Sequence, residues 1–226
     1  MTLIFPQRKY SISQNIPTPE PETPDTVTLD GSIDANGNLA TDSSKVTLTF
    51  GQAIPIQTFT LHLSCNFFRY GSNTYYLPCQ LLLSEEINST SGDRPQPQLN
   101  FTIANEHMGL YVGTWASGNG YEFNPNLRGN YQYSPMEYTI NVSFAEYSDT
   151  HYKIALPTGT YNYSEGSHTY PPEAVTYSQV GDLVLVPKTC KITGFNLQNF
   201  NYSRLRTNVN NSYVEIAGEK HYAIPA

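Results

Sequence analysis

The chain has 226 residues and a formal net charge of −7, and only 14% of its residues are charged. Twelve lysines and arginines against nineteen acids leave no basic stripe for phosphate groups, so the sequence predicts no nucleic-acid partner. No apolar run reaches the length of about eighteen residues that a membrane span needs, and Met1 to Tyr10 lack the apolar core of a secretory signal peptide.

Residues 1–26 are predicted to form an extended arm and a proline-rich spacer, followed by a β-sandwich domain at 27–226 of one or two subdomains. Four prolines between positions 17 and 24 disfavour helix and sheet pairing and favour polyproline II, a stiff spacer of about 30 Å. The apolar residues before it are too few to bury one another, which predicts an assembly arm that docks on another surface. The arm residues are Leu3, Ile4, Phe5, Tyr10 and Ile12.

From Val27 onward the pattern is strand, turn, strand. Polar and apolar residues alternate in several windows, as expected of half-buried strands. These windows are 45–50, 58–65, 98–103, 137–144 and 191–197. The continuous apolar run at 182–187 predicts a central strand that is buried on both faces. Asn36-Gly37 predicts a type I′ hairpin, because both central residues of that turn need positive φ.

No window has a helical period longer than two turns, and clusters of Gly, Pro, Asn and Ser separate the short strands. The sequence therefore predicts an all-β fold, an antiparallel β-sandwich of jelly-roll-like topology with an extended N-terminal arm.

The three cysteines are too few for a disulfide scaffold. Residues 59–83 are predicted to form a hairpin with its turn at 71–73, and this register places Cys65 opposite Cys79. Two interpretations stay open at this point, a disulfide across the two strands and a pair of reduced thiols in the core. The second is favoured, because most free cysteines are buried core residues.

Residues that could do chemistry are scattered. The five histidines form no metal-binding motif, and no serine-nucleophile signature or glycine-rich phosphate loop occurs. A glycosidase would need two carboxylates at a fixed separation, and nothing in the spacing of Glu85, Glu86, Glu137 and Glu146 pairs them. The sequence predicts no catalytic residue, no metal, no cofactor and no enzymatic activity.

The segment 109–133 is the richest in aromatic residues, which alternate there with glycine and asparagine. Three interpretations fit it, namely core filling, a subunit interface and a glycan-binding surface, because aromatic rings offer a large contact area at low entropic cost. The candidate interface or glycan-contact residues are Tyr111, Trp115, Tyr121, Tyr131 and Tyr133.

An apolar arm, a stiff spacer and a compact β domain together predict a non-enzymatic structural component of a virus or phage particle, such as a minor capsid, vertex, spike or fibre-head protein. Its predicted partners are further copies of itself in a homo-oligomer, other virion or surface-assembly proteins, and a host glycan used for attachment. The alternative prediction is a carbohydrate-binding adhesin or lectin module that is extracellular or on the cell surface.

Overall fold

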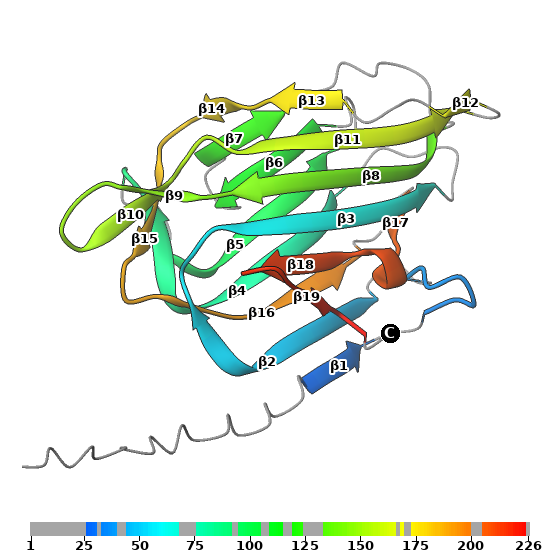
Figure 1. Ribbon diagram of the computed structural model, residues 1–226, viewed down its shortest axis with the longest axis horizontal. Helices are drawn as coiled ribbons and strands as arrows, with labels where there is room; N and C mark the ends of the chain where they lie inside the picture. The colour runs from blue at the N-terminus through cyan, green and yellow to red at the C-terminus, as the bar shows by residue number, and fades with distance from the viewer. Residues whose placement is uncertain are drawn as a thin grey trace, which may run out of the picture.

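The computed structural model of the chain describes residues 26–30, 33–39, 44–67, 76–91, 95–104, 109–114, 119–123, 133–165, 168–169, 173–199 and 205–224. Over these residues it contains nineteen strands and one short 3-10 helix. The strands form two antiparallel sheets that lie one over the other, as Figure 1 shows. The predicted antiparallel β-sandwich is confirmed. Among the described residues, no helix is long and apolar enough to cross a membrane.

The larger sheet has the spatial order β1-β2-β16-β4-β5-β6-β7-β14, and β15, β10 and β9 extend it from β4. Its strands are β1 (Thr26–Asp30), β2 (Lys45–Pro55), β4 (Tyr76–Ser89), β5 (Gln96–Ala104), β6 (Gly109–Thr114), β7 (Asn119–Phe123), β9 (Phe144–Glu146), β10 (His151–Ile154), β14 (Ser178–Val180), β15 (Val184–Pro187) and β16 (Lys191–Gln198).

The smaller sheet has the order β12-β11-β8-β3-β18-β19, with β13 beside β11 and β17 beside β3. Its strands are β3 (Phe59–Phe67), β8 (Tyr133–Val142), β11 (Thr158–Glu165), β12 (His168–Thr169), β13 (Glu173–Thr176), β17 (Leu205–Thr207), β18 (Tyr213–Ile216) and β19 (Glu219–Tyr222). The 3-10 helix η1 (Val209–Asn211) joins β17 to β18.

Strands from the two ends of the chain lie side by side in both sheets. In the larger sheet β16 lies between β2 and β4, and in the smaller sheet β18 pairs with β3. This interleaving is the feature that the strand order shares with a jelly roll. The sandwich is therefore closed by hydrogen bonds between residues more than a hundred positions apart.

The core lies between the sheets and is built by the alternation that the sequence predicts. Along β2, Val46 and Leu48 are buried while their neighbours are more exposed. Phe59 of the smaller sheet and Phe101 of the larger sheet meet edge to face across the sandwich, with ring centroids 5.8 Å apart. Complete burial of a side chain of this size contributes about 1.5–3 kcal/mol.

The predicted hairpin over residues 59–83 is wrong. Its two halves are β3 and β4, which belong to opposite sheets. Cys65 and Cys79 are both buried and free. Burial raises the pKa of both thiols, and the nearby Cys79 adds to the effect at Cys65. Both thiols therefore lie in the core, on strands that do not pair with each other. The interpretation as reduced core residues is confirmed.

Two local predictions also need correction. The run 182–187 yields the short strand β15, which pairs with β4 and β10. Val184 and Val186 are buried and Leu185 and Pro187 are half-buried, so the core covers one face of the strand instead of both. The turn after Asp34 is type I followed by a bulge. Of its residues only Gly37 has positive φ, at 83°, and its N–H donates to the Asp34 carbonyl.

The ladder along β3 is interrupted at Ser64. Strand β17 pairs with β3 from Cys65 onward and β18 pairs with it up to His62, so η1 forms an excursion between them. The Ser64 carbonyl accepts a hydrogen bond from the Asn208 N–H at 2.8 Å. The Ser64 N–H donates instead to the Ser212 hydroxyl at 2.9 Å. Thus a side chain replaces the missing backbone acceptor, and Ser212 is completely buried.

Side-chain amides connect the turn at residues 34–38 to this excursion. The Asn208 side chain donates to the Asn36 carbonyl at 2.9 Å and to Asn38 Oδ1 at 3.0 Å. Asn38 in turn donates to both carboxylate oxygens of Asp34. Burial tends to raise the pKa of Asp34, but the hydrogen bonds from Asn38 and Asn36 outweigh it and leave that pKa below its usual value. The network joins residues about 170 positions apart.

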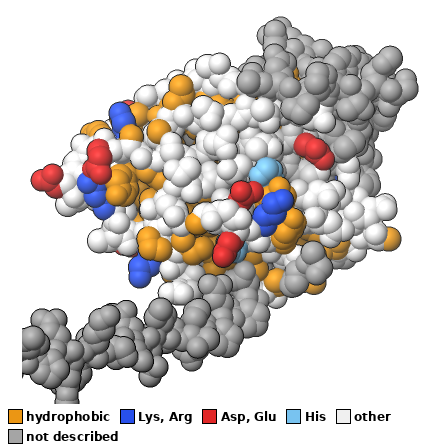
Figure 2. Space-filling model, in the orientation of Figure 1, with side chains coloured by type: hydrophobic (Ala, Val, Ile, Leu, Met, Phe, Trp, Pro, Cys, Tyr) orange, Lys and Arg blue, Asp and Glu red, His pale blue; other side chains and the backbone are white. Residues whose placement is uncertain are grey.

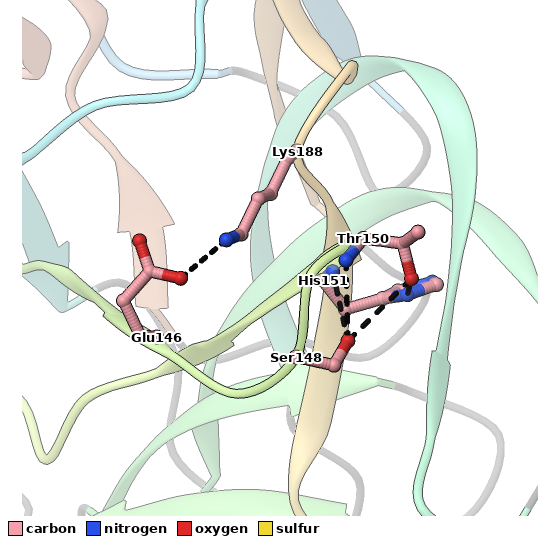
Figure 3. Close-up of polar contacts among 5 residues, drawn as sticks. All are labelled: Glu146, Ser148, Thr150, His151 and Lys188. Carbon is pink, nitrogen blue, oxygen red and sulfur yellow. Dashed lines mark hydrogen bonds and ion pairs between the residues drawn. The ribbon is translucent and has the colours of Figure 1, made fainter.

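The turn between β9 and β10 is held by a serine hydroxyl in an exposed setting (Figure 3). Ser148 Oγ accepts the N–H groups of Thr150 at 3.4 Å and His151 at 3.1 Å. Close by, Lys188 forms an ion pair with Glu146. Ser148 at the surface and Ser212 inside the sandwich thus have the same role, since the hydroxyl of each accepts hydrogen bonds from backbone N–H groups.

Replacing Ser212 with alanine should lower the free energy of unfolding by about 1–3 kcal/mol, because the buried Ser64 N–H loses its acceptor. Ser148→Ala is the matched control. It also removes an acceptor of backbone N–H groups, but water replaces it at the surface, so the loss should stay within about 0.5 kcal/mol. Urea unfolding of both variants measures the two values, and equal losses would contradict a special role for Ser212.

Candidate functional site

A row of side chains crosses the outer face of the smaller sheet. Tyr222 on β19 lies opposite Tyr213 on β18. His62 on β3 lies opposite Tyr213 on one side and Thr139 on β8 on the other. Successive residues of a strand point to opposite faces, and Val214 beside Tyr213 is buried in the core, so the row points outward.

The aromatic members of this row stack on one another. The rings of His62 and Tyr213 are nearly parallel, with an interplanar angle of 20° and centroids 4.2 Å apart. Tyr213 and Tyr222 follow at 4.9 Å and 42°. Lys220 Nζ lies 4.7 Å from the centroid of the Tyr213 ring, within the range of a cation–π interaction. The stack is half-buried, so its rings are held in place and still partly accessible.

A shallow hollow of about 290 Å³ borders the stack. Polar groups from three elements surround it: Thr139 and Glu137 of β8, Ser64 of β3, and Asn210 and Asn211 of η1. In Figure 2 the corresponding area of β3, β18 and β19 shows a histidine beside acidic, basic and hydrophobic side chains. We call this surface, with the rings of His62, Tyr213 and Tyr222, the aromatic groove. Its volume is at the lower end of small-molecule sites, which run from about 300 to 1,000 Å³.

The excursion described above creates the groove. The Ser212 hydroxyl is hydrogen-bonded to Ser64 and Asn208, and η1 lies between these two contacts as a loop between β17 and β18. This places the exposed Asn210 and Asn211 at one end of the row, beside Tyr213. A regular ladder at this point would leave the outer face flat.

The surroundings of His62 lower its pKa and so favour its neutral form. Burial lowers its pKa below the ordinary value of 6.5, and this effect outweighs the Glu215 carboxylate, whose Oε2 lies 3.8 Å from Nε2 and favours the charged form. Lys220 lowers the His62 pKa further. The other ring nitrogen of His62, Nδ1, lies 3.4 Å from the Thr139 hydroxyl. The partly exposed ring therefore offers a hydrogen-bonding edge, and its neutral form is favoured.

The aromatic residues predicted from the 109–133 segment lie elsewhere. Tyr121 is buried, and its hydroxyl donates to the Ile154 carbonyl at 2.9 Å, so its ring belongs to the core, one of the three interpretations that the sequence left open. The Tyr111 hydroxyl donates to the carbonyls of Thr114 and Asn119, and burial raises the Tyr111 pKa.

The remaining predicted residues fall outside what the structure describes. These are Trp115, Tyr131, the side chain of Tyr133 and the arm residues Leu3, Ile4, Phe5, Tyr10 and Ile12. Their predicted roles stay predictions, and so does the division into an arm at 1–26 and a domain at 27–226.

No group of three or more potential metal ligands occurs among the described residues. The two acids nearest the stack, Glu137 and Glu215, are two strands and four residues apart in register. This spacing separates their Cα atoms by about 16 Å. The groove thus combines partly exposed aromatic rings with amide and hydroxyl groups.

No family model matches the chain, and no curated protein matches its sequence. Among solved structures, the chain is similar to the exoplasmic/lumenal domain of VIP36 in its Ca²⁺-bound form, with a TM-score of 0.38 and 8% sequence identity over 89% of this chain and 84% of that one. A likeness at this level carries no argument about ligand or activity.

The sequence contains a local pattern that predicts part of the groove, at residues 213–222, outside the aromatic-rich segment 109–133. Residues 213–216 alternate as Tyr-Val-Glu-Ile, and Ala217-Gly218 separates them from Glu-Lys-His-Tyr at 219–222. Both turn residues have positive φ, at 53° and 86°, as a type I′ hairpin requires. A hairpin in this register places Tyr213 opposite Tyr222, so this pair could be read from the turn and the alternation. The contribution of His62 could not, because it comes from a strand 150 residues earlier.

The lowered pKa of His62 predicts a loss of stability in acid. The unfolded chain takes up this proton near pH 6.5 and the folded chain only at lower pH, so acidification favours unfolding. The free energy of unfolding should fall as the pH drops below about 6.5 and level off once the folded pKa is passed. His62→Gln should remove this part of the dependence. Urea unfolding between pH 8 and pH 5 compares the two proteins, and superimposable pH profiles would contradict the assignment.

Proposed function

We propose that this chain is a non-enzymatic carbohydrate-binding module and that the aromatic groove is its binding site. The observation that carries the proposal is the fixed stack of His62, Tyr213 and Tyr222 beside a hollow with amide, hydroxyl and carboxylate groups. A sugar ring has an apolar face of C–H groups and a rim of hydroxyls. Aromatic rings bind the first and polar side chains the second.

The charges around the groove support a neutral sugar as the ligand. Glu137 lines the hollow and Glu215 lies beside His62, whereas Lys220 is engaged with the Tyr213 ring. An anionic sugar or a phosphate would be repelled by the two carboxylates. The small volume suits one or two sugar units better than a long stretch of polysaccharide. In this proposal the chain acts outside the cell or on a surface where such glycans are displayed.

The second candidate is the structural role in a virus or phage particle. The observation that favours it is a separate hollow between β2 and the β18–β19 hairpin, next to Thr49, where the pairing of β1 with β2 stops. The two functions are compatible, because a particle protein that recognises a host glycan would need both a binding groove and a means of assembly.

The proposal predicts that Tyr213→Ala weakens glycan binding about fivefold or more, since an aromatic ring in contact with the ligand contributes on the order of 1 kcal/mol or more. Tyr213→Phe keeps the ring and should retain most of the affinity. Tyr147→Ala is the control, because Tyr147 is 49% exposed on the β9–β10 turn, away from the groove. A glycan array selects the ligand, and titration calorimetry then compares the variants.

Thermal unfolding of each variant separates a loss of binding from a loss of folding. The proposal fails if the wild-type chain binds no glycan on the array. It also fails if a folded Tyr213→Ala variant binds the selected glycan as tightly as the wild type does.

A further inference from the structure

The turn at residues 34–38 lies beside η1 and supports the end of the aromatic groove (Figure 1). The side chain of Asn208, at the start of η1, is hydrogen-bonded to the Asn36 carbonyl and to Asn38, as described above. In addition, the Val209 N–H donates to the Gly37 carbonyl at 2.8 Å. These bonds join segments about 170 positions apart, so the place of η1 depends on a turn near the other end of the chain.

Gly37 also contacts a residue of the groove, the side chain of Asn210. A Cβ atom at position 37 would overlap Asn210 Nδ2 and would lie 2.6 Å from Asn210 Cγ, which is closer than a nonbonded contact allows. The space that Gly37 leaves empty is therefore the space in which the Asn210 amide rests. The φ of Gly37 is 83°, so its backbone conformation favours glycine as well.

The Asn210 amide is held at the groove with its hydrogen-bonding groups available. Asn210 is exposed and lines the hollow beside Tyr213. Within the described part of the chain its side-chain amide has no hydrogen-bond partner, whereas the amides of Asn208 and Asn38 are both bonded. A side-chain amide offers N–H donors and a carbonyl acceptor, and both match the hydroxyls of a sugar.

The contact with Gly37 restricts where this amide can go. An exposed asparagine ordinarily exchanges among several rotamers, and binding a ligand then costs the entropy of fixing one of them. Asn210 is confined on one side by the backbone of Gly37. A group that is already confined loses less freedom when it binds, which makes the same hydrogen bond more favourable.

We propose that Gly37 is a positioning residue of the glycan site: it leaves the space that holds the Asn210 amide at the groove, and this amide binds hydroxyls of a neutral sugar. The inference rests on the function proposed above and adds a residue outside the groove to it. Because the amide is the end of an exposed side chain, a Cβ at position 37 displaces Asn210 and leaves the backbone of the turn in place.

Gly37→Ala should weaken glycan binding about three- to tenfold, the range expected for one hydrogen bond. Gly218→Ala is the matched control, because Gly218 has a similar φ of 86° but a Cβ there would meet no atom of the described chain within 4 Å. It should lower the melting temperature to a similar extent and leave the affinity unchanged. The probes are neutral mono- and disaccharides of glucose, galactose, mannose and N-acetylglucosamine, first on an array and then in titration calorimetry.

A double-mutant cycle separates positioning from folding. Asn210→Ala removes the amide and should weaken binding by a similar factor. In the Asn210→Ala background, Gly37→Ala should have no further effect on affinity, because the added Cβ has no amide to displace. If Gly37 acted only through the stability of the fold, its substitution would cause the same loss in both backgrounds.

A second readout needs no sugar. The NMR resonance of the Asn210 side-chain amide, assigned by its absence in Asn210→Ala, should shift in Gly37→Ala and stay unchanged in Gly218→Ala. If Gly37→Ala fails to fold, Gly37→Asn replaces it in every measurement. Asparagine tolerates positive φ and still carries the Cβ that displaces Asn210.

The possible failures are distinguishable. If the wild type binds sugars on the array and Asn210→Ala binds them equally well, the inference is wrong and the proposed function stands. The same holds if substitution of Gly37 lowers the affinity equally with and without the Asn210 amide, or leaves its resonance unshifted. A wild-type chain that binds none of the sugars overturns the proposed function, and the inference with it.

Discussion

The hydrogen bond from the Ser64 N–H to the Ser212 hydroxyl is the interaction on which the aromatic groove depends. Where β17 stops pairing with β3 and β18 has not yet begun, a buried N–H needs an acceptor. Ser212 supplies it and lets the five residues from Asn208 to Ser212 pass opposite two residues of β3. The excursion that results carries Asn210 and Asn211 to the outer face and starts β18 at Tyr213, directly opposite His62.

Local patterns predicted the class of fold and the position of most strands. Alternation such as that of Val46 and Leu48 is a property of one strand and can be read from a few residues. The pairing of strands is a property of the whole chain. Residues 59–83 have the spacing of a hairpin, yet β3 and β4 lie in opposite sheets, because the apolar faces of both are buried by packing one sheet on the other. The local sequence therefore does not determine whether two neighbouring strands pair in one sheet or pack in opposite sheets.

The candidate site shows the same limit more sharply. Tyr121 and Tyr213 are similar in sequence terms, since each lies in a short strand and has an asparagine two residues before it. Burial separates them: Tyr121 faces the core and Tyr213 faces outward. Which side of a strand is covered depends on the other sheet, so the aromatic density of a segment could not reveal whether its rings would be accessible. The positive-φ pair Ala217 and Gly218 was the more informative local signal, because a turn fixes a register and a register fixes a face.

The position of β16 between β2 and β4 has a consequence for how the protein is made. These two strands are complete once Ser89 has been synthesised, but the strand that belongs between them ends at Gln198. While the intervening chain emerges from the ribosome, β2 and β4 each present an unpaired edge, and long-range closure of this kind is intrinsically slow. A nascent chain in this state is vulnerable to intermolecular strand pairing. Any truncation before Lys191 would make that temporary condition permanent, so the chain must be expressed through β16 to give a closed sandwich.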